Sequence, residues 1–133
     1  MNVGFTGTRR GMTDAQYNSV WALLCYRAPG HFHHGDCTGA DEKAAHLARH
    51  AGMRIICHPP TDSRLRANVV SDETRAPRPY LDRNHDIVDE TTELIATPGE
   101  FEEQLRSGTW STVRYARRQG RRVLVVLPDG RLM

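Results

Sequence analysis

Apolar and amphipathic stretches alternate along the whole chain, and their order predicts alternating strands and helices. Strand candidates lie at residues 2–6, 31–34, 53–58, 92–97 and 122–127. Each is short and bounded by glycine, proline or polar residues, as strands in the interior of a sheet are. Apolar residues recur at helical spacing between them.

Local capping patterns indicate where the helices begin and end. Thr13 and Gln16 form a capping box ahead of the apolar positions Tyr17, Val20, Trp21 and Leu24, and Cys25 is expected in the helix core. Thr38 and Asp41 form a second capping-box pair, and Gly52 ends that helix. Pro79 can start a third helix, and a fourth runs from about Thr109 to Gly120.

The strands are too continuously apolar for a sheet with one wet face, so helices should cover both sides of a parallel sheet. We therefore predict a single α/β domain over residues 1–133, a Rossmann-like three-layer sandwich with a mostly parallel sheet of about five strands. Ligands bind such sheets outside the carboxyl ends of the strands, where the strand order reverses.

Glycine turns with hydroxyl residues follow three of the predicted strands. They read TGTRRG, GDCTGAD and SGTWST, and each precedes or opens a helix. Glycine lets a ligand approach the free N–H groups at a helix N-terminus, which attract anions. The spacing matches neither G-x-G-x-x-G nor G-x-x-x-x-G-K-[ST], which argues against an ordinary dinucleotide dehydrogenase or P-loop ATPase. The turns predict a phosphate site of another kind.

Composition adds little to this picture. A net charge of +2 is too small to indicate a partner. The chain has no apolar run of membrane-spanning length, its first residues lack the order of a signal peptide, and three irregularly spaced cysteines make no disulfide framework. We expect a cytoplasmic protein with no membrane partner.

The motifs together resemble the SLOG superfamily, specifically its YpsA-like branch. The resemblance rests on GFTGTRRGMT, HHGDCTGAD, HPP at 58–60, YLDRNHDIVDETTELIATP and RSGTWSTVRYAR, which span nearly the whole chain. It implies a Rossmann-like domain that binds nucleotides or nucleotide-derived ligands, often in bacterial or phage conflict systems, and a homodimer. The relatives include LOG phosphoribohydrolases, DprA proteins and the sensor domains of NAD-linked defence proteins.

The resemblance implies that Gly7, Thr8, Gly35, Thr38, Gly39, Gly108 and Thr109 line the phosphate and ribose site, with Asp41 orienting the second turn. The candidate ligand-binding set also includes the neighbours Arg9 and Asp36, and Arg83 and Asn84 from the family-like run. The expected activity is binding of a phosphorylated nucleoside, an ADP-ribose-like molecule or a cyclic relative, for sensing or sequestration, and no cofactor is expected.

Two enzymatic or binding alternatives stay open. The first is nucleotide N-glycosidase activity of LOG type, but the LOG motif P-G-G-x-G-T-x-x-E has a glutamate where this chain has Thr112. Asp36, Asp41, Glu100, Glu102 and Glu103 are the acids near the predicted edge. The second is single-stranded nucleic-acid binding by the basic run 114–122, which lacks interleaved aromatic platforms beyond Tyr115 and Trp110. We expect neither.

The histidine-rich stretch raises the question of a metal. Zinc would recruit Cys37, Cys57, His58 and some of His31, His33 and His34, yet no C-x-x-C or H-E-x-x-H pair is present. On a strand, His31 and His33 share one face and His34 faces the other, so we expect no metal site. The polar segment 61–79 is unusually long for a connection and is expected to be an arginine-bearing lid or a solvated loop.

Overall fold

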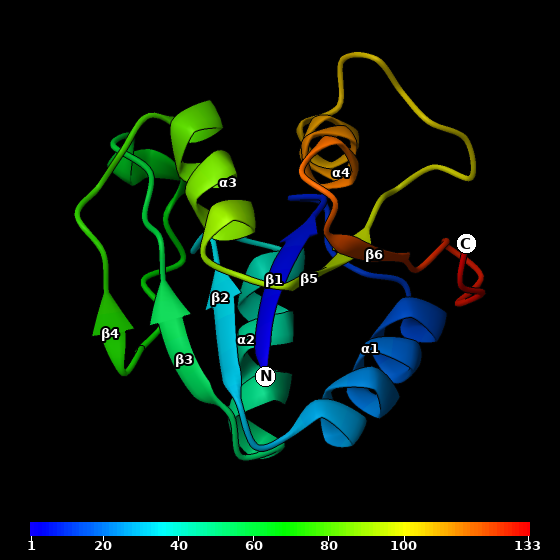
Figure 1. Cartoon of the computed structure of the whole chain (residues 1–133), viewed down its shortest axis with the longest axis horizontal. Coiled ribbons are helices and arrows are strands. Elements are labelled where there is room, and N and C mark those ends of the chain that lie inside the picture. The colour runs from blue at the N-terminus through cyan, green and yellow to red at the C-terminus, as the bar shows by residue number, and fades with distance from the viewer.

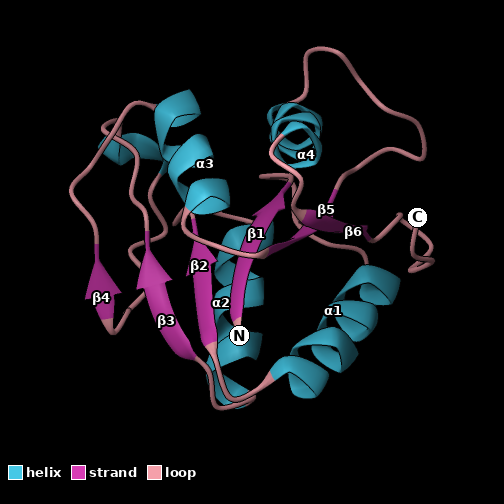
Figure 2. Ribbon diagram, viewed as in Figure 1, coloured by secondary structure: helices cyan, strands magenta, loops and turns pink.

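A six-stranded, wholly parallel sheet forms the middle layer of the protein (Figures 1 and 2). The computed structural model describes all 133 residues. The strands are β1 (Asn2–Gly7), β2 (His31–His34), β3 (Arg54–Cys57), β4 (Glu73–Thr74), β5 (Glu93–Thr97) and β6 (Arg122–Val125). The helices are α1 (Asp14–Arg27), α2 (Ala40–His50), α3 (Tyr80–Asp89) and α4 (Gly108–Arg118). The predicted three-layer α/β architecture is confirmed.

The strand order β4-β3-β2-β1-β5-β6 places the reversal of direction between β1 and β5. From β1 the chain adds strands outward to β4, then returns to add β5 and β6 on the other side of β1. Loops that leave β1 and β5 therefore diverge at the carboxyl edge of the sheet. In folds of this kind, that divergence opens a crevice.

Two apolar clusters hold the helices on opposite faces of the sheet. One joins α1 and α2 to residues such as Phe5, Phe32 and Ile55. The other joins α3 and α4 to residues such as Leu94 and Ala96. Because side chains alternate along a strand, neighbouring residues of one strand serve both clusters, as Leu94 and Ile95 do. Strands buried on both faces explain the continuous apolar runs in the sequence.

Strand β4, the one strand that was not predicted, lies in the segment 61–79, which was expected to be a lid or a loop. Residues 61–79 contain a short 3-10 turn at Ser63–Leu65 and the two-residue strand β4, which pairs with β3. The sequence ET of β4 is too short to show strand periodicity. The prediction of about five strands therefore missed this edge strand.

Three local predictions need correction. The Thr13 and Gln16 capping box is present, but Gly39 caps α2 without a side-chain hydrogen bond, so the Thr38 and Asp41 capping box is absent. Cys25 is exposed instead of lying in the helix core. Tyr17 and Trp21 are also partly exposed, because α1 buries only the narrow face formed by Gln16, Val20 and Leu24.

No helix has both the length and the apolar character needed to cross a membrane.

Candidate functional site

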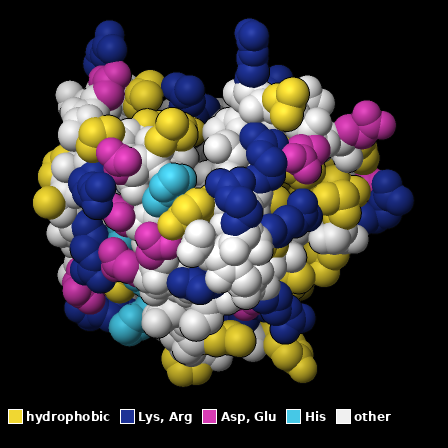
Figure 3. All heavy atoms as spheres, turned by 45° about the horizontal axis from the view of Figure 1, so that its top comes forward, with side chains coloured by type: hydrophobic (Ala, Val, Ile, Leu, Met, Phe, Trp, Pro, Cys, Tyr) yellow, Lys and Arg dark blue, Asp and Glu magenta, His cyan; other side chains and the backbone are white.

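A cavity of about 450 Å³ opens at the carboxyl edge of the sheet, between the loops that follow β1 and β5. This is the point where the strand order reverses. Figure 3 brings this edge toward the viewer and shows dark blue lysine and arginine side chains gathered around the middle of the face. The cavity is lined by Gly7, Thr8, Arg9, Arg10, Tyr80, Gly99, Glu100, Ser107, Gly108 and Thr109. Its size is that of a small-molecule site.

The turn after β1 is built around Gly7. A Cβ atom at Gly7 would collide with Thr97 Oγ1 and would lie 2.6 Å from the Cβ of Ala40, so no side chain fits there. The carbonyl of Thr8 accepts hydrogen bonds from the N–H groups of Gly11 and Ala40, which ties the turn to α2. The turn is thus fixed before any ligand arrives, and it presents Arg9 and Arg10 at the mouth of the cavity.

The start of α4 supplies hydrogen-bond donors to the same cavity. The Ser107 hydroxyl caps the helix by accepting a hydrogen bond from the Trp110 N–H at 3.2 Å. No group of the protein accepts from the N–H groups of Gly108 and Thr109, which lie in the first turn and line the cavity. Free N–H groups and the positive end of the helix dipole favour an anion here.

Gly108 also makes room for Tyr80. A Cβ atom at Gly108 would lie 2.5 Å from the Tyr80 hydroxyl oxygen. The glycine therefore brings the tyrosine of α3 against the start of α4, where Tyr80 lines the cavity. The close approach of Tyr80 explains why this residue is a glycine. Its backbone is not in the left-handed conformation that would otherwise require one.

One carboxylate stands among these positive groups. Glu100 pairs with Arg10 at 3.0 Å and accepts a hydrogen bond from the indole N–H of Trp110, also at 3.0 Å. Trp110 is fully buried, so it holds Glu100 in place, whereas the Arg10 side chain is 74 % exposed. The cavity thus offers two guanidinium groups and free N–H donors for an anion, together with one positioned acceptor for hydroxyl groups.

The second glycine turn lies outside the cavity. Asp36 is buried, and its carboxylate accepts hydrogen bonds from the Val69 N–H and from Arg66. The Asp41 carboxylate accepts from the backbone N–H groups of Gly35 and Cys37, and burial raises its pKa to about 6. These hydrogen bonds fasten the turn to the 61–79 segment and to α2. Thr38 is exposed at its surface, and Gly39 borders a separate depression beside α1.

Arg83 and Asn84 are buried behind the cavity. The Arg83 guanidinium donates hydrogen bonds to the carbonyls of Gly35 and His58 and to the Asn84 side-chain oxygen. These donors are engaged within the protein and do not face a ligand. The same guanidinium lies 5.0 Å from the centre of the Tyr80 ring. Arg83 therefore connects the second turn to a residue of the cavity wall.

The structure thus brings together only part of the predicted ligand-binding set. Gly7, Thr8, Arg9, Gly108 and Thr109 line one cavity, whereas Gly35, Asp36, Thr38, Gly39, Asp41, Arg83 and Asn84 do not. The predicted ligand-binding set lacked four lining residues, Arg10, Tyr80, Gly99 and Ser107, and treated Glu100 only as an edge acid. Their position in the chain could have indicated them. They follow β1 or β5, or begin a helix, and so belong to the same edge of the sheet as the glycine turns.

Thr112 and the basic run 114–122 also have structural partners. The buried Thr112 hydroxyl donates to the Gly108 carbonyl at 2.9 Å, which supports the turn at the start of α4. Arg114 pairs with Glu103, and Arg121 donates to carbonyls that include that of Val88. Trp110 is buried and Tyr115 stacks on His85, so neither presents a free face to a base.

The arginines of the 61–79 segment do not reach the cavity. Each pairs with an acid nearby: Arg64 with Asp62, Arg66 with Asp36, Arg75 with Glu73 and Glu90, and Arg78 with Asp86. The segment therefore forms the outer edge of the sheet and is held by ion pairs, and it is not a lid over the cavity.

Two groups of side chains have the composition of metal ligands. His33, His58 and Glu90 form one group, and His34, Asp36 and Cys57 form the other. His33 and His34 do face opposite sides of the sheet, as their spacing predicts, but each meets partners from distant parts of the chain.

No protein-family model and no curated protein matches this sequence. Solved structures do match. A molybdenum cofactor binding protein from Rippkaea orientalis has a TM-score of 0.72 and 19 % identity over 96 % of this chain and 76 % of its own. DprA from Streptococcus pneumoniae gives 0.70 and 19 %, over 93 % and 49 %. DprA from Helicobacter pylori, whose structure concerns single-stranded DNA binding, gives 0.61 and 16 %, over 92 % and 63 %.

At these identities the similarity shows a shared fold and nothing finer. The chain has the Rossmann-like, parallel α/β fold of these proteins.

Proposed function

We propose that the protein binds a phosphorylated, nucleotide-derived ligand in the cavity between β1 and β5, and acts as a sensor or sequestering protein of the YpsA-like branch. The single observation that carries the proposal is the convergence of free α4 N–H groups with Arg9 and Arg10 at the reversal of strand order. A phosphate there would accept from the Gly108 and Thr109 N–H groups and from a guanidinium.

The remaining groups suit the nucleoside part of such a ligand. Glu100 can accept hydrogen bonds from a ribose diol, as acidic residues do in other Rossmann-like sites. The Tyr80 ring offers the one aromatic side chain in the cavity lining. ADP-ribose-like molecules and cyclic nucleotides combine these features. The proteins of similar fold include a molybdenum cofactor binding protein and a DprA that binds single-stranded DNA. Fold similarity alone therefore does not select among anionic ligands.

Binding without hydrolysis is favoured by the chemistry of the cavity. The LOG-type glutamate is replaced by Thr112, whose hydroxyl is engaged with the Gly108 carbonyl. Glu100 is the only acid in the lining, so the cavity lacks the pair of carboxyl groups that glycoside hydrolysis commonly uses. We predict no multiple turnover on nucleoside monophosphates, NAD or ADP-ribose. Chromatography for free base and ribose phosphate checks this, and repeated turnover would contradict the binding-only function.

A thermal-shift panel of nucleoside monophosphates, NAD, ADP-ribose and cyclic dinucleotides tests the proposal. A ligand at about 100 times its dissociation constant adds ~2.7 kcal/mol to the free energy of unfolding. For a domain of this size we expect a rise in melting temperature on the order of 10 °C. Gly108→Glu should abolish that rise, because it places a carboxylate where the phosphate binds. An equal rise in parent and variant would contradict the site.

Gly108→Glu should itself fold. The nearest atoms to an added Cβ atom all belong to the hydroxyl end of the Tyr80 ring, which must shift, and Gly108 is not in a left-handed conformation. A carboxylate at a helix N-terminus is favourable by about 0.3 to 1 kcal/mol. Circular dichroism provides the control for the fold.

A further inference from the structure

Two histidines from neighbouring strands face each other beneath α3. His33 lies on β2, and its register partner on β3 is Ile56. His58 follows Ile56 by two residues and therefore faces the same side of the sheet as His33. The His33 Nδ1 and His58 Nε2 atoms are 2.8 Å apart, and both residues are buried. No local spacing in the sequence reveals this pair.

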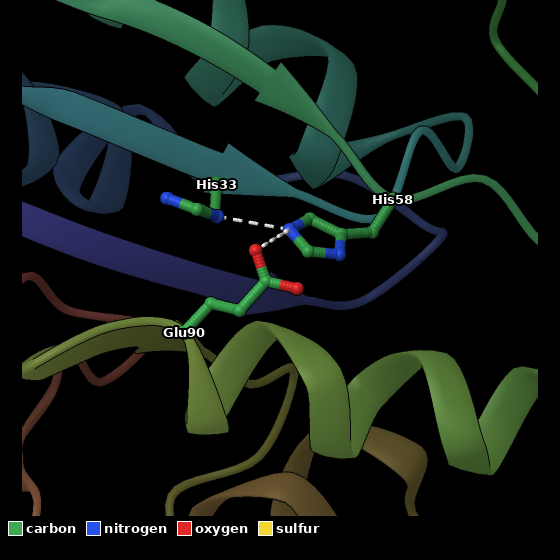
Figure 4. A group of neighbouring side chains, drawn as sticks. All are labelled: His33, His58 and Glu90. Carbon is green, nitrogen blue, oxygen red and sulfur yellow. Dashed lines mark hydrogen bonds and ion pairs between the residues drawn. The ribbon is translucent and has the colours of Figure 1, made fainter. Parts of the chain in front are cut away.

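A carboxylate completes the group from the opposite layer. Glu90 caps the end of α3, and its Oε1 lies 4.0 Å from His58 Nε2. Figure 4 shows the three side chains pointing toward one another from β2, from the segment after β3 and from α3. One ligand atom from each lies within 4.8 Å of the other two. Glu90 is 36 % exposed, which leaves the group open to solvent on one side.

The spacing is close to that of a metal centre. Nitrogen and oxygen ligands lie about 2.0 to 2.2 Å from zinc, so two ligand atoms of a tetrahedral ion are about 3.3 Å apart. The observed 2.8 and 4.0 Å fall on either side of that value. The third pair, His33 and Glu90, lies within 4.8 Å, so small side-chain movements would bring all three ligand atoms to the spacing of one ion.

The protonation states also suit a cation. Burial lowers the pKa of His33 to about 4 and that of His58 to about 3, so both rings are neutral at physiological pH. Neutral imidazole is the ligand form. The two facing nitrogens share one proton in their hydrogen bond; on metal binding that proton moves to the remote nitrogen of its own ring, and no proton need be released.

We propose that His33, His58 and Glu90 form a binding site for a divalent transition-metal ion of the zinc class, with one coordination position open to water or another ligand. Two imidazoles and one carboxylate are a known zinc ligand set and suit borderline-soft divalent ions better than Mg²⁺ or Ca²⁺. This site is separate from the cavity between β1 and β5. It revises the expectation of no metal, which rested on the missing C-x-x-C and H-E-x-x-H spacing and on the split faces of the histidine run, and did not include Glu90.

The second ligand-like group does not compete with this assignment. His34 accepts a hydrogen bond from the Asp36 N–H and contacts the Ser71 hydroxyl, and Asp36 is held by Arg66 and Val69. Burial raises the pKa of the Cys57 thiol to about 12, so it is not a thiolate. The nitrogen and oxygen atoms of that group are already engaged in hydrogen bonds within the protein.

Arg75 would compete with a bound metal ion for the Glu90 carboxylate. It pairs with Glu90 at 3.0 Å and with Glu73 at 3.2 Å. A bound cation must share the Glu90 carboxylate with this guanidinium. Removing the guanidinium frees the carboxylate and removes a like charge, so Arg75→Gln should raise metal affinity, roughly tenfold. A purely structural histidine pair would not respond in this way.

The test uses the full chain, free of any histidine tag and treated with chelator. Zn²⁺ is titrated by calorimetry, and Co²⁺ by its visible absorption. The parent and Gly108→Glu should bind one ion per chain, and Mg²⁺ should not compete. His33→Gln and His58→Gln should each lose more than about 100-fold in affinity, since loss of an outer-shell partner alone costs about 10 to 100-fold. His46→Gln and His50→Gln, on the exposed face of α2, are the matched controls.

The proposal is overturned if the parent binds no Zn²⁺, or if His33→Gln and His58→Gln bind as the controls do. Should either histidine variant fail to fold, the surface residues decide the question. Glu90→Gln must then weaken Zn²⁺ binding and Arg75→Gln must strengthen it. Unchanged affinity in both overturns the site. None of these outcomes depends on the phosphorylated ligand.

Discussion

Arg10 and Glu100 show how single residues set the chemistry of the cavity. Arg10 lies at its mouth and is anchored only by Glu100 and by the Thr8 hydroxyl. A guanidinium that pairs with a phosphate contributes a charge-assisted hydrogen bond, which is worth about 1.5 to 3 kcal/mol. The residue is therefore free to exchange its solvent contacts for a ligand.

We predict that Arg10→Ala weakens binding of the phosphorylated ligand by about 10 to 100-fold and leaves stability nearly unchanged. Calorimetric titration measures the affinity. Arg64→Ala is the matched control, because Arg64 is exposed and pairs only with its neighbour Asp62. Equal affinity of the two variants would remove Arg10 from the site.

Residue types alone located part of the site. Gly7, Thr8, Gly108 and Thr109 could be predicted because glycine and a hydroxyl residue at a strand-to-helix turn have a direct physical use. The second turn has the same composition, yet its acids bond to Val69, Arg66 and backbone groups 4 to 33 residues away. The sequence does not show which turn will be closed by such distant partners.

At the scale of elements, a buried ion pair fixes the start of β5. Glu93 accepts two hydrogen bonds of 2.7 Å from the Arg27 guanidinium at the end of α1. The side chains are only 8 % and 3 % exposed. The pair thus ties the end of α1 to the first residue of β5, and the other end of this strand leads into Gly99 and Glu100 of the cavity.

We predict that Glu93→Ala lowers the free energy of unfolding by about 3 to 5 kcal/mol, because it leaves the Arg27 charge buried without its partner. Glu73→Ala, in a pair that is largely exposed, should cost less than about 1 kcal/mol. Replacing both residues of the buried pair, as Arg27→Met with Glu93→Leu, should recover most of the loss. Denaturant unfolding measures all three, and a small effect of Glu93→Ala would show that water reaches the pair.

The elements that could be predicted are those with a repeated signal. Five strands and four helices follow from apolar runs and helical spacing, and the parallel order follows from their alternation. Strand β4 could not be predicted, because its two residues carry no periodicity and its place depends on pairing with β3. The His33, His58 and Glu90 group is hidden for a similar reason, since its members meet only through sheet register and helix packing.

For the whole molecule, buried titratable groups determine how stability depends on pH. Burial lowers the pKa of His33 and His34 to about 4 and of His58 to about 3, whereas burial raises the pKa of Asp41 to about 6. The three histidines stabilise the fold above pH ~6.5 and lose that contribution as the pH falls toward 4. Asp41 acts in the opposite direction between about pH 6 and 4.

We predict a net loss of stability on acidification, because three histidines outweigh one aspartate. Near pH 5 the free energy of unfolding should fall by about 2 to 3 kcal/mol per pH unit. Urea unfolding at several pH values between 7.5 and 5 measures the slope. Constant or increasing stability over that range would mean that the histidines are charged in the folded protein.

The central claim is that the crevice between β1 and β5 holds a phosphorylated, nucleotide-derived molecule. Native mass spectrometry of the parent and of Gly108→Glu, each purified under mild conditions, tests this most directly. The account predicts an added mass on the parent that dissociates as one phosphorylated nucleotide-derived compound, and no such mass on the folded variant. The same compound retained by both proteins, or a parent that neither retains nor takes up any member of the nucleotide panel, would contradict it.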